Sequence, residues 1–166
     1  MKIGFAVAAS SLGKVLVAGT ERGISAVYLG DDERTLVSAL QKEYPRAEIA
    51  RSAASNETWL KEILSRVEGY APSKDLPLDV QATAFQRRVW QELQKIPLGA
   101  TRTYTQVARA LGKPNSVRAV ARACATNPTS IVVPCHRVIR TDGELAGYRW
   151  GLPRKQKLLE REGARA

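Results

Sequence analysis

The chain has 166 residues, of which 44% are hydrophobic and 25% charged, and its formal net charge is +10 at pH 7. Two cysteines exclude a disulfide scaffold, and no apolar run approaches the roughly 18 to 20 residues of a membrane span. We therefore expect a cytoplasmic protein without a signal peptide, and no structural metal, because two cysteines and one histidine cannot complete a zinc site.

The positive charge is confined to the second half of the chain. Residues 1–81 hold 10 Lys/Arg and 11 Asp/Glu, whereas residues 82–166 hold 16 Lys/Arg and 5 Asp/Glu. This asymmetry favours a polyanionic partner such as DNA or RNA, with a solvated basic surface as the alternative.

The first half reads as a small α/β domain over residues 1–81. A meander of three antiparallel strands is predicted at Ile3–Ala8, Lys14–Ala18 and Ile24–Leu29. Asp31 can cap a helix to about Glu43, and Asn56 can begin another helix to about Glu68. Residues 69–77, rich in Gly, Pro and Ser, read as a linker.

The second half, residues 82–166, predicts a mainly α domain with a helix-turn-helix. Capping boxes at Thr83-x-x-Gln86 and Thr103-x-x-Gln106 begin two helices, and Asn115 can cap a third to about Ala125. Residues 141–143 predict the hairpin turn of a wing. Pro153 at the first position and Gly163 beyond the end bracket the last helix.

The third helix of this half has an apolar and a basic side. At about 100° per residue, Val117, Val120, Ala121 and Cys124 fall together, so we interpret Cys124 as a core residue. The opposite side carries two arginines among small residues, which suits sequence-independent contact with the minor groove. This predicted outer face comprises Asn115, Arg118, Ala119, Arg122, Ala123 and Thr126.

Cys135 stands beside His136, the only histidine, after the apolar run 131–133. A thiol attacks only as its thiolate and needs a base, a cation or a helix N-terminus nearby. His136 can accept the proton, directly or through a water, Arg137 adds positive charge, and Pro134 suits the first position of a helical turn.

Glu162 falls on the same face of the last helix as Leu158 and Leu159. A buried carboxylate needs a partner, and His136 is the candidate that makes chemical sense, because a carboxylate fixes the tautomer of an imidazole. A solvated Glu162 near a frayed end remains equally open.

With these residues in view, the chain resembles the O6-alkylguanine-DNA alkyltransferases, also called methylated-DNA–protein-cysteine methyltransferases, in particular the C-terminal part of the bacterial Ada branch. The resemblance covers nearly the whole chain. Its carriers are Thr83-Ala84-Phe85-Gln86-x-x-Val89-Trp90, Tyr104-Thr105-Gln106-Val107-Ala108, Val117-Arg118-Ala119-Val120, Asn127-Pro128, Ile131-Val132-Val133-Pro134-Cys135-His136-Arg137-Val138 and Gly147-Tyr148-Arg149-Trp150-Gly151.

The resemblance implies a ribonuclease-H-like N-terminal domain and a winged helix-turn-helix C-terminal domain that binds the minor groove of double-stranded DNA. It implies that Cys135 takes the alkyl group of flipped O6-alkylguanine, and also of O4-alkylthymine, in one irreversible turnover without a cofactor, and that the protein is a monomer.

The resemblance also implies a role for each site residue. His136 would accept the thiol proton and Glu162 would orient it, Asn127 would support the turn, and Tyr104 would assist flipping and donate to the leaving guanine. Arg118 would fill the vacated space in the duplex. The pocket would be lined by Pro134, Val138, Tyr148 and Arg149.

Two features of the sequence depart from the family pattern, and they bear on phosphotriester repair, transcriptional activation and the size of the pocket. The zinc-binding module of Ada-type proteins is not in this sequence, and Arg149 stands where other branches carry a small hydroxyl residue.

A non-catalytic winged-helix or lesion-sensing DNA-binding protein is one alternative to the alkyltransferase function, although lesion sensors replace the cysteine. A cysteine hydrolase using Cys135 and His136 is another, but it would leave the basic half without a purpose.

Overall fold

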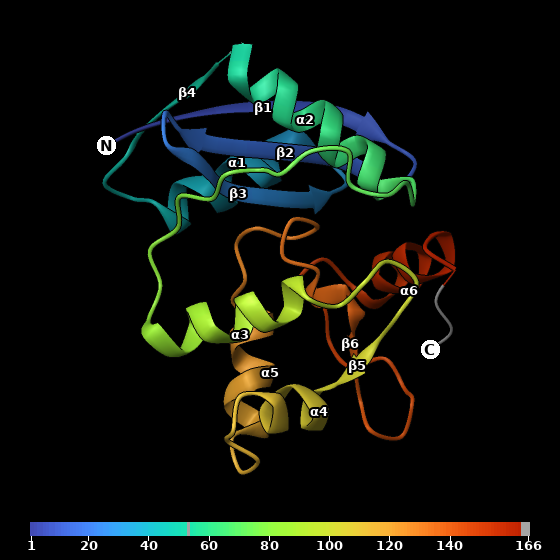
Figure 1. Ribbon diagram of the computed structural model, residues 1–166. Coiled ribbons are helices and arrows are strands. Elements are labelled where there is room, and N and C mark those ends of the chain that lie inside the picture. The colour runs from blue at the N-terminus through green and yellow to red at the C-terminus, as the bar shows by residue number, and fades with distance from the viewer. Residues whose placement is uncertain (53, 164–166) are drawn as a thin grey trace. The chain divides into compact units, whose positions relative to one another are not determined.

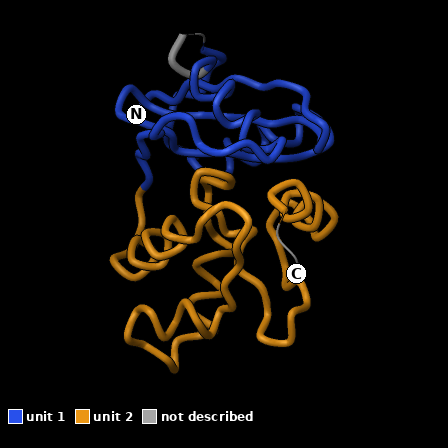
Figure 2. The backbone as a smooth tube through the Cα atoms, turned by 45° about the vertical axis from the view of Figure 1, so that its right-hand side comes forward, with its two compact units in different colours: residues 1–80 blue, residues 81–166 orange. Residues whose placement is uncertain are grey.

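A computed structural model describes residues 1–52 and 54–163 of the chain (Figure 1). The chain divides into two compact units, residues 1–80 and 81–166, shown in different colours in Figure 2. Within the described ranges, no helix is long and apolar enough to cross a membrane.

The first unit is built on a four-stranded mixed sheet in the order β3-β2-β1-β4. The predicted antiparallel meander is confirmed, because β1 pairs with β2 and β2 with β3, both antiparallel. The parallel edge strand β4 was not predicted, since its four residues are mostly exposed and carry no alternating apolar pattern. The strands are β1 (Lys2–Ser10), β2 (Gly13–Thr20), β3 (Gly23–Gly30) and β4 (Glu48–Arg51).

Two helices pack on this sheet, α1 (Glu33–Glu43) against β2 and β3, and α2 (Ala54–Val67) against β1 and β2. The cap of α1 is Asp32, not Asp31, because its Oδ1 accepts from the backbone N–H of Thr35 at 2.9 Å. The second helix begins at Ala54, so the prediction that Asn56 begins it is wrong by two residues.

The segment predicted as a linker, residues 69–77, is hydrogen-bonded to α2 through the buried Glu62. The Glu62 carboxylate accepts from the backbone N–H and the hydroxyl of Ser73 and from Arg66 Nε at 2.7 Å. Arg66 in turn donates to the carbonyl of Lys74. Residues 73 and 74 are therefore part of the first unit.

The second unit contains four helices among its described residues, together with a 3-10 turn and two very short strands. Both predicted capping boxes are confirmed, with Thr83 before α3 and Thr103 before α4. The elements are α3 (Ala84–Gln94), β5 (Arg102–Thr103), α4 (Tyr104–Ala110), α5 (Val117–Ala125), η1 (Cys135–Arg137), β6 (Val138–Ile139) and α6 (Leu152–Arg161).

Two local predictions for this unit need correction, and one is confirmed. The N-cap of α5 is Ser116, not Asn115, and it makes no side-chain capping bond. The predicted turn at residues 141–143 is confirmed, because Gly143 N donates to the carbonyl of Arg140 and Arg140 N to the carbonyl of Glu144, the bonds of a three-residue hairpin loop with Gly143 at a φ of 82°. Helix α6 begins at Leu152, one residue before Pro153.

Candidate active site

The Cys135 thiol lies at the start of η1, where the buried run 131–133 ends. Pro134 is the N-cap of this turn and Cys135 its first residue, one position later than predicted. Cys135 is only 5% exposed. Ile131 adopts a φ of 75°, a left-handed conformation that is strained for a β-branched side chain.

Asn127 joins the thiol to the chain that leads to it. Its Nδ2 donates to the carbonyl of Val133 at 3.0 Å and lies 3.3 Å from Cys135 Sγ. Its Oδ1 accepts from the backbone N–H and the hydroxyl of Thr129. The amide therefore fixes the loop on both sides of Ile131, the network role expected for it.

Glu162 is bound by two partners, so a frayed and solvated Glu162 is excluded. Its Oε2 lies 2.9 Å from His136 Nε2, the pairing that was one of the two alternatives left open by the sequence. Arg137 Nε donates to Oε1 at 2.8 Å and Nη2 donates to Oε2 at 3.0 Å. This bidentate salt bridge was not predicted. Gly99 lies against the same end of α6, because a Cβ on it would come 3.3 Å from the backbone oxygen of Glu162.

The electrostatics of this cluster leave His136 as a neutral base. Burial opposes ionisation of Glu162, but His136 and Arg137 outweigh it and lower its pKa to about 2, so it is a carboxylate at pH 7. Burial lowers the pKa of His136, and Arg137 acts in the same direction. Glu162 then accepts the Nε2 proton, which leaves Nδ1 as an acceptor.

Burial raises the pKa of the Cys135 thiol, while the Asn127 hydrogen bond and the charges of Lys155 and Arg149 lower it. Sequence reasoning missed Lys155, which is 0% exposed and donates from Nζ to the carbonyls of Val138 (2.7 Å) and Ala146 (3.1 Å). Burial lowers the pKa of Lys155. Because burial is the largest influence on Cys135, the resting sulfur keeps its proton and needs a base to react.

A cavity of about 550 Å³ brings together four of the predicted site residues: Tyr104, Arg118, Tyr148 and Arg149. Burial raises the pKa of Tyr104, so its hydroxyl is a proton donor at pH 7. The Arg149 guanidinium lies 4.6 Å from the centre of the Trp150 ring. Pro134 and Val138, predicted as pocket residues, are buried and are not among the lining residues of this cavity.

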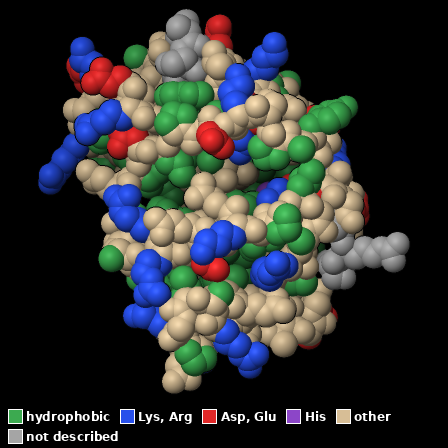
Figure 3. Space-filling model, in the orientation of Figure 1, with side chains coloured by type: hydrophobic (Ala, Val, Ile, Leu, Met, Phe, Trp, Pro, Cys, Tyr) green, Lys and Arg blue, Asp and Glu red, His purple; other side chains and the backbone are tan. Residues whose placement is uncertain are grey.

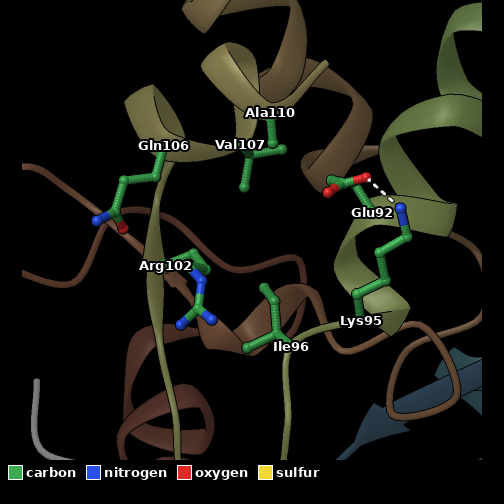
Figure 4. Close-up of a pocket in the computed structure, with 7 residues that line it drawn as sticks. All are labelled: Glu92, Lys95, Ile96, Arg102, Gln106, Val107 and Ala110. Atoms are coloured by element: carbon green, nitrogen blue, oxygen red, sulfur yellow. Dashed lines mark hydrogen bonds and ion pairs between the residues drawn. The ribbon is translucent and has the colours of Figure 1, made fainter.

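A second cavity, of about 230 Å³, is lined by residues of α3, β5 and α4 (Figure 4). It contains the ion pair between Lys95 Nζ and Glu92 Oε2, 3.0 Å apart. Neither Cys135 nor His136 lines it. Neither of them lines the larger cavity either, which is linked to the site by Tyr104, Tyr148 and the two predicted arginines instead.

The predicted outer face of α5 is correct for its arginines and wrong for one alanine. Asn115, Arg118 and Arg122 are exposed and Ala119 is half-buried. Ala123 is only 3% exposed, because it packs toward α3, where Trp90 Nε1 donates to its carbonyl at 3.0 Å. Cys124 is buried, as predicted for a core residue.

Lys and Arg side chains outnumber Asp and Glu in the part of Figure 3 that shows the second unit. This agrees with the excess of basic residues in that half of the sequence. Exposed cations of this kind favour binding to a phosphate backbone.

The model of the 6-O-methylguanine DNA methyltransferase DNA-binding domain matches residues 84–164. The chain is 48% identical over 162 residues to the bifunctional transcriptional activator/DNA repair enzyme Ada of Escherichia coli, covering 98% of this chain and 46% of that protein. It thus spans about half the length of that relative. It is 37% identical to the methylated-DNA–protein-cysteine methyltransferase of Methanosarcina acetivorans, covering 96% of this chain and 98% of that protein.

Solved structures show the same fold over the whole chain. The O6-methylguanine methyltransferase of Mycobacterium tuberculosis superposes with a TM-score of 0.79 and 32% identity, covering 99% of this chain and 94% of that one. The structure of M. tuberculosis OGT in complex with DNA superposes with a TM-score of 0.78, covering 100% of this chain and 95% of that one.

Proposed function

The chain belongs to the methylated-DNA–protein-cysteine methyltransferase family, and we propose that it repairs DNA by moving the alkyl group of O6-alkylguanine irreversibly to Cys135. O4-alkylthymine is a second substrate. One arrangement carries the proposal: the buried Cys135 next to His136, whose Nε2 is held by Glu162 while Nδ1 is left as an acceptor.

The reaction begins with the proton of Cys135, which passes through a water to Nδ1 of the neutral His136. The thiolate attacks the alkyl carbon, an S–C bond forms and the C–O6 bond breaks with its electrons on guanine. The Tyr104 hydroxyl donates to the departing base, which makes it a better leaving group. The thioether is stable, so each molecule reacts once.

The partner is double-stranded DNA, met by the outer face of α5 in the minor groove. Arg118 and Arg122 are exposed on this helix beside the half-buried Ala119, which allows close approach. Arg118 also lines the larger cavity, so it is placed to fill the gap that a flipped guanine leaves. The protein acts as a monomer on DNA in the cytoplasm.

We also propose a finer description of the two units. The mixed sheet with α1 and α2 corresponds to the ribonuclease-H-like domain of the family, and α4, α5 and the residues around β6 correspond to a winged helix-turn-helix.

The test is to incubate the chain with duplex DNA carrying O6-methylguanine and to weigh its peptides. The expected result is one added methyl group on the Cys135 peptide, in wild type and in Cys124→Ala, and none in Cys135→Ala. If the wild-type Cys135 peptide gains no methyl mass, the proposal is wrong. Equal binding to damaged and undamaged DNA with an inert thiol would then indicate a non-catalytic DNA-binding protein.

A further inference from the structure

Two buried polar atoms of the described side chains have no hydrogen-bond partner: His136 Nδ1 and the Tyr148 hydroxyl. Buried polar groups are almost always hydrogen-bonded, and leaving one unpaired costs about 1–3 kcal/mol. Each of these two atoms therefore needs a partner, and a buried water is one that both can bind.

The two atoms are complementary in chemistry. His136 Nδ1 is an acceptor, because the Nε2 proton faces Glu162. Burial raises the pKa of Tyr148, so its hydroxyl keeps a proton that it can donate. Ser130 lowers that pKa as a neighbouring hydrogen-bonding group, but its contact with the Tyr148 hydroxyl lacks hydrogen-bond geometry, and its own hydroxyl accepts from Trp150 Nε1 at 2.7 Å.

The thiol belongs to the same group of atoms. Negative charge on Cys135 raises the pKa of Tyr148, second only to burial, so the sulfur and the phenol lie within electrostatic reach of each other. A buried water needs two to four polar partners. Cys135 Sγ, His136 Nδ1 and the Tyr148 hydroxyl supply three.

We propose that the Tyr148 hydroxyl holds the water through which Cys135 passes its proton to His136, so that Tyr148 is a positioning residue and not only a wall of the cavity. This inference rests on the proposed function and names a further residue for it.

The proton balance requires no other reactant. The S–H bond breaks as the water accepts that proton, and the water releases one of its own to Nδ1, which forms the imidazolium. The Tyr148 O–H bond stays intact throughout. It donates to the water oxygen before and after the transfer and so keeps the water between sulfur and nitrogen.

Other groups act on Cys135, His136 or Tyr148 and must be kept constant in a test. Four of these groups lie in or next to α6: Arg149, Arg154, Lys155 and Glu162. The others are Arg137, which follows His136, Tyr104 of α4 and Cys124 of α5. Tyr148→Phe changes none of them and keeps the aromatic ring.

The experiment measures the rate at which iodoacetamide alkylates Cys135 as a function of pH, without DNA, in a Cys124→Ala background. Tyr148→Phe should slow the reaction at pH 7 about tenfold, the worth of one hydrogen bond, and move the midpoint of the profile to higher pH. Tyr70→Phe, at an exposed tyrosine, is the control and should match the parent. A Tyr148→Phe profile equal to that of the parent overturns the inference.

A second measurement separates this inference from the proposed function. In single-turnover methyl transfer from duplex DNA, Tyr148→Phe should lower the maximal rate and leave the half-saturating DNA concentration unchanged. A change in that concentration alone would mean that the hydroxyl contacts the base, and would also overturn the inference. The iodoacetamide result needs no DNA repair activity, so it stands or fails independently of the proposed function.

Discussion

Asn127 donates a hydrogen bond to the sulfur of Cys135, with Nδ2 and Sγ 3.3 Å apart. The same nitrogen lies 3.0 Å from the carbonyl oxygen of Val133, so one amide sets both the thiol and the chain that leads to it. A hydrogen bond to sulfur favours the thiolate, and this contact lowers the pKa of a thiol that burial raises.

Asn127→Ala should destabilise the protein and make Cys135 less reactive. The change leaves both Thr129 donors unpaired in the interior and removes one of the two hydrogen bonds to the Val133 carbonyl, which should lower the free energy of unfolding by about 2–4 kcal/mol. Urea unfolding measures the first effect, and the pH profile of iodoacetamide alkylation the second. Asn115→Ala, at an exposed position, should change neither.

Glu162 should make stability depend on acid pH. The unfolded carboxyl takes up its proton near its ordinary pKa of 4.5 and the folded one only near about 2. The free energy of unfolding therefore contains a contribution of about 3 kcal/mol above pH 5, which is lost as pH falls through that window.

Glu162→Gln removes this contribution. Urea unfolding should be measured from pH 7 to pH 2. The free energy of unfolding should depend less on pH in this variant than in wild type, with the largest difference between the two at pH 7. Glu160→Gln, on the exposed side of α6, is the matched control and should follow wild type. If the free energy of unfolding depends on pH equally in Glu162→Gln and wild type, Glu162 does not contribute to the acid dependence of stability.

Lys155→Met should slow methyl transfer at pH 7 and allow recovery at higher pH. The charge of Lys155 lowers the pKa of Cys135, so its removal leaves less thiolate at neutral pH; we expect a loss of about tenfold. Single-turnover rates between pH 6 and 9 measure this. Lys157→Met, an exposed neighbour, should behave as wild type. A loss that is the same at every pH would show that Lys155 acts only through the two carbonyls that it binds.

Arg118→Ala should weaken repair of duplex DNA more than reaction with the free base O6-benzylguanine, because only the duplex has a gap to fill. The ratio of the two single-turnover rates, compared with wild type, measures the effect. Arg122→Ala should weaken DNA binding in a salt-dependent way without changing that ratio. Equal losses of Arg118→Ala on both substrates would remove its role in base flipping.

Local patterns predicted much of this structure. The meander follows from three apolar runs with turn residues between them, and the two capping boxes from a Thr and a Gln three positions apart. The pairing of His136 with Glu162 could be put forward beside a solvated Glu162, because the chain has one histidine and a carboxylate on an apolar helix face.

Long-range contacts explain what was missed. Arg137 reaches Glu162 only because η1 turns it and His136 toward one carboxylate, and a three-residue turn has no periodicity to detect. Lys155 did leave a signal. It precedes Leu158, Leu159 and Glu162 at helical spacing, so a charged residue begins and ends the apolar stripe of α6.

Gly99 lies outside every catalytic motif in the sequence, yet it touches the backbone of the residue that orients His136. With a φ of 86° and the Glu162 oxygen 3.3 Å from any added Cβ, every replacement strains the backbone and crowds the end of α6. When natural sequence variants of this gene are classified by their effect, a change at Gly99 should be grouped with lesions of the active site and not with neutral loop polymorphisms.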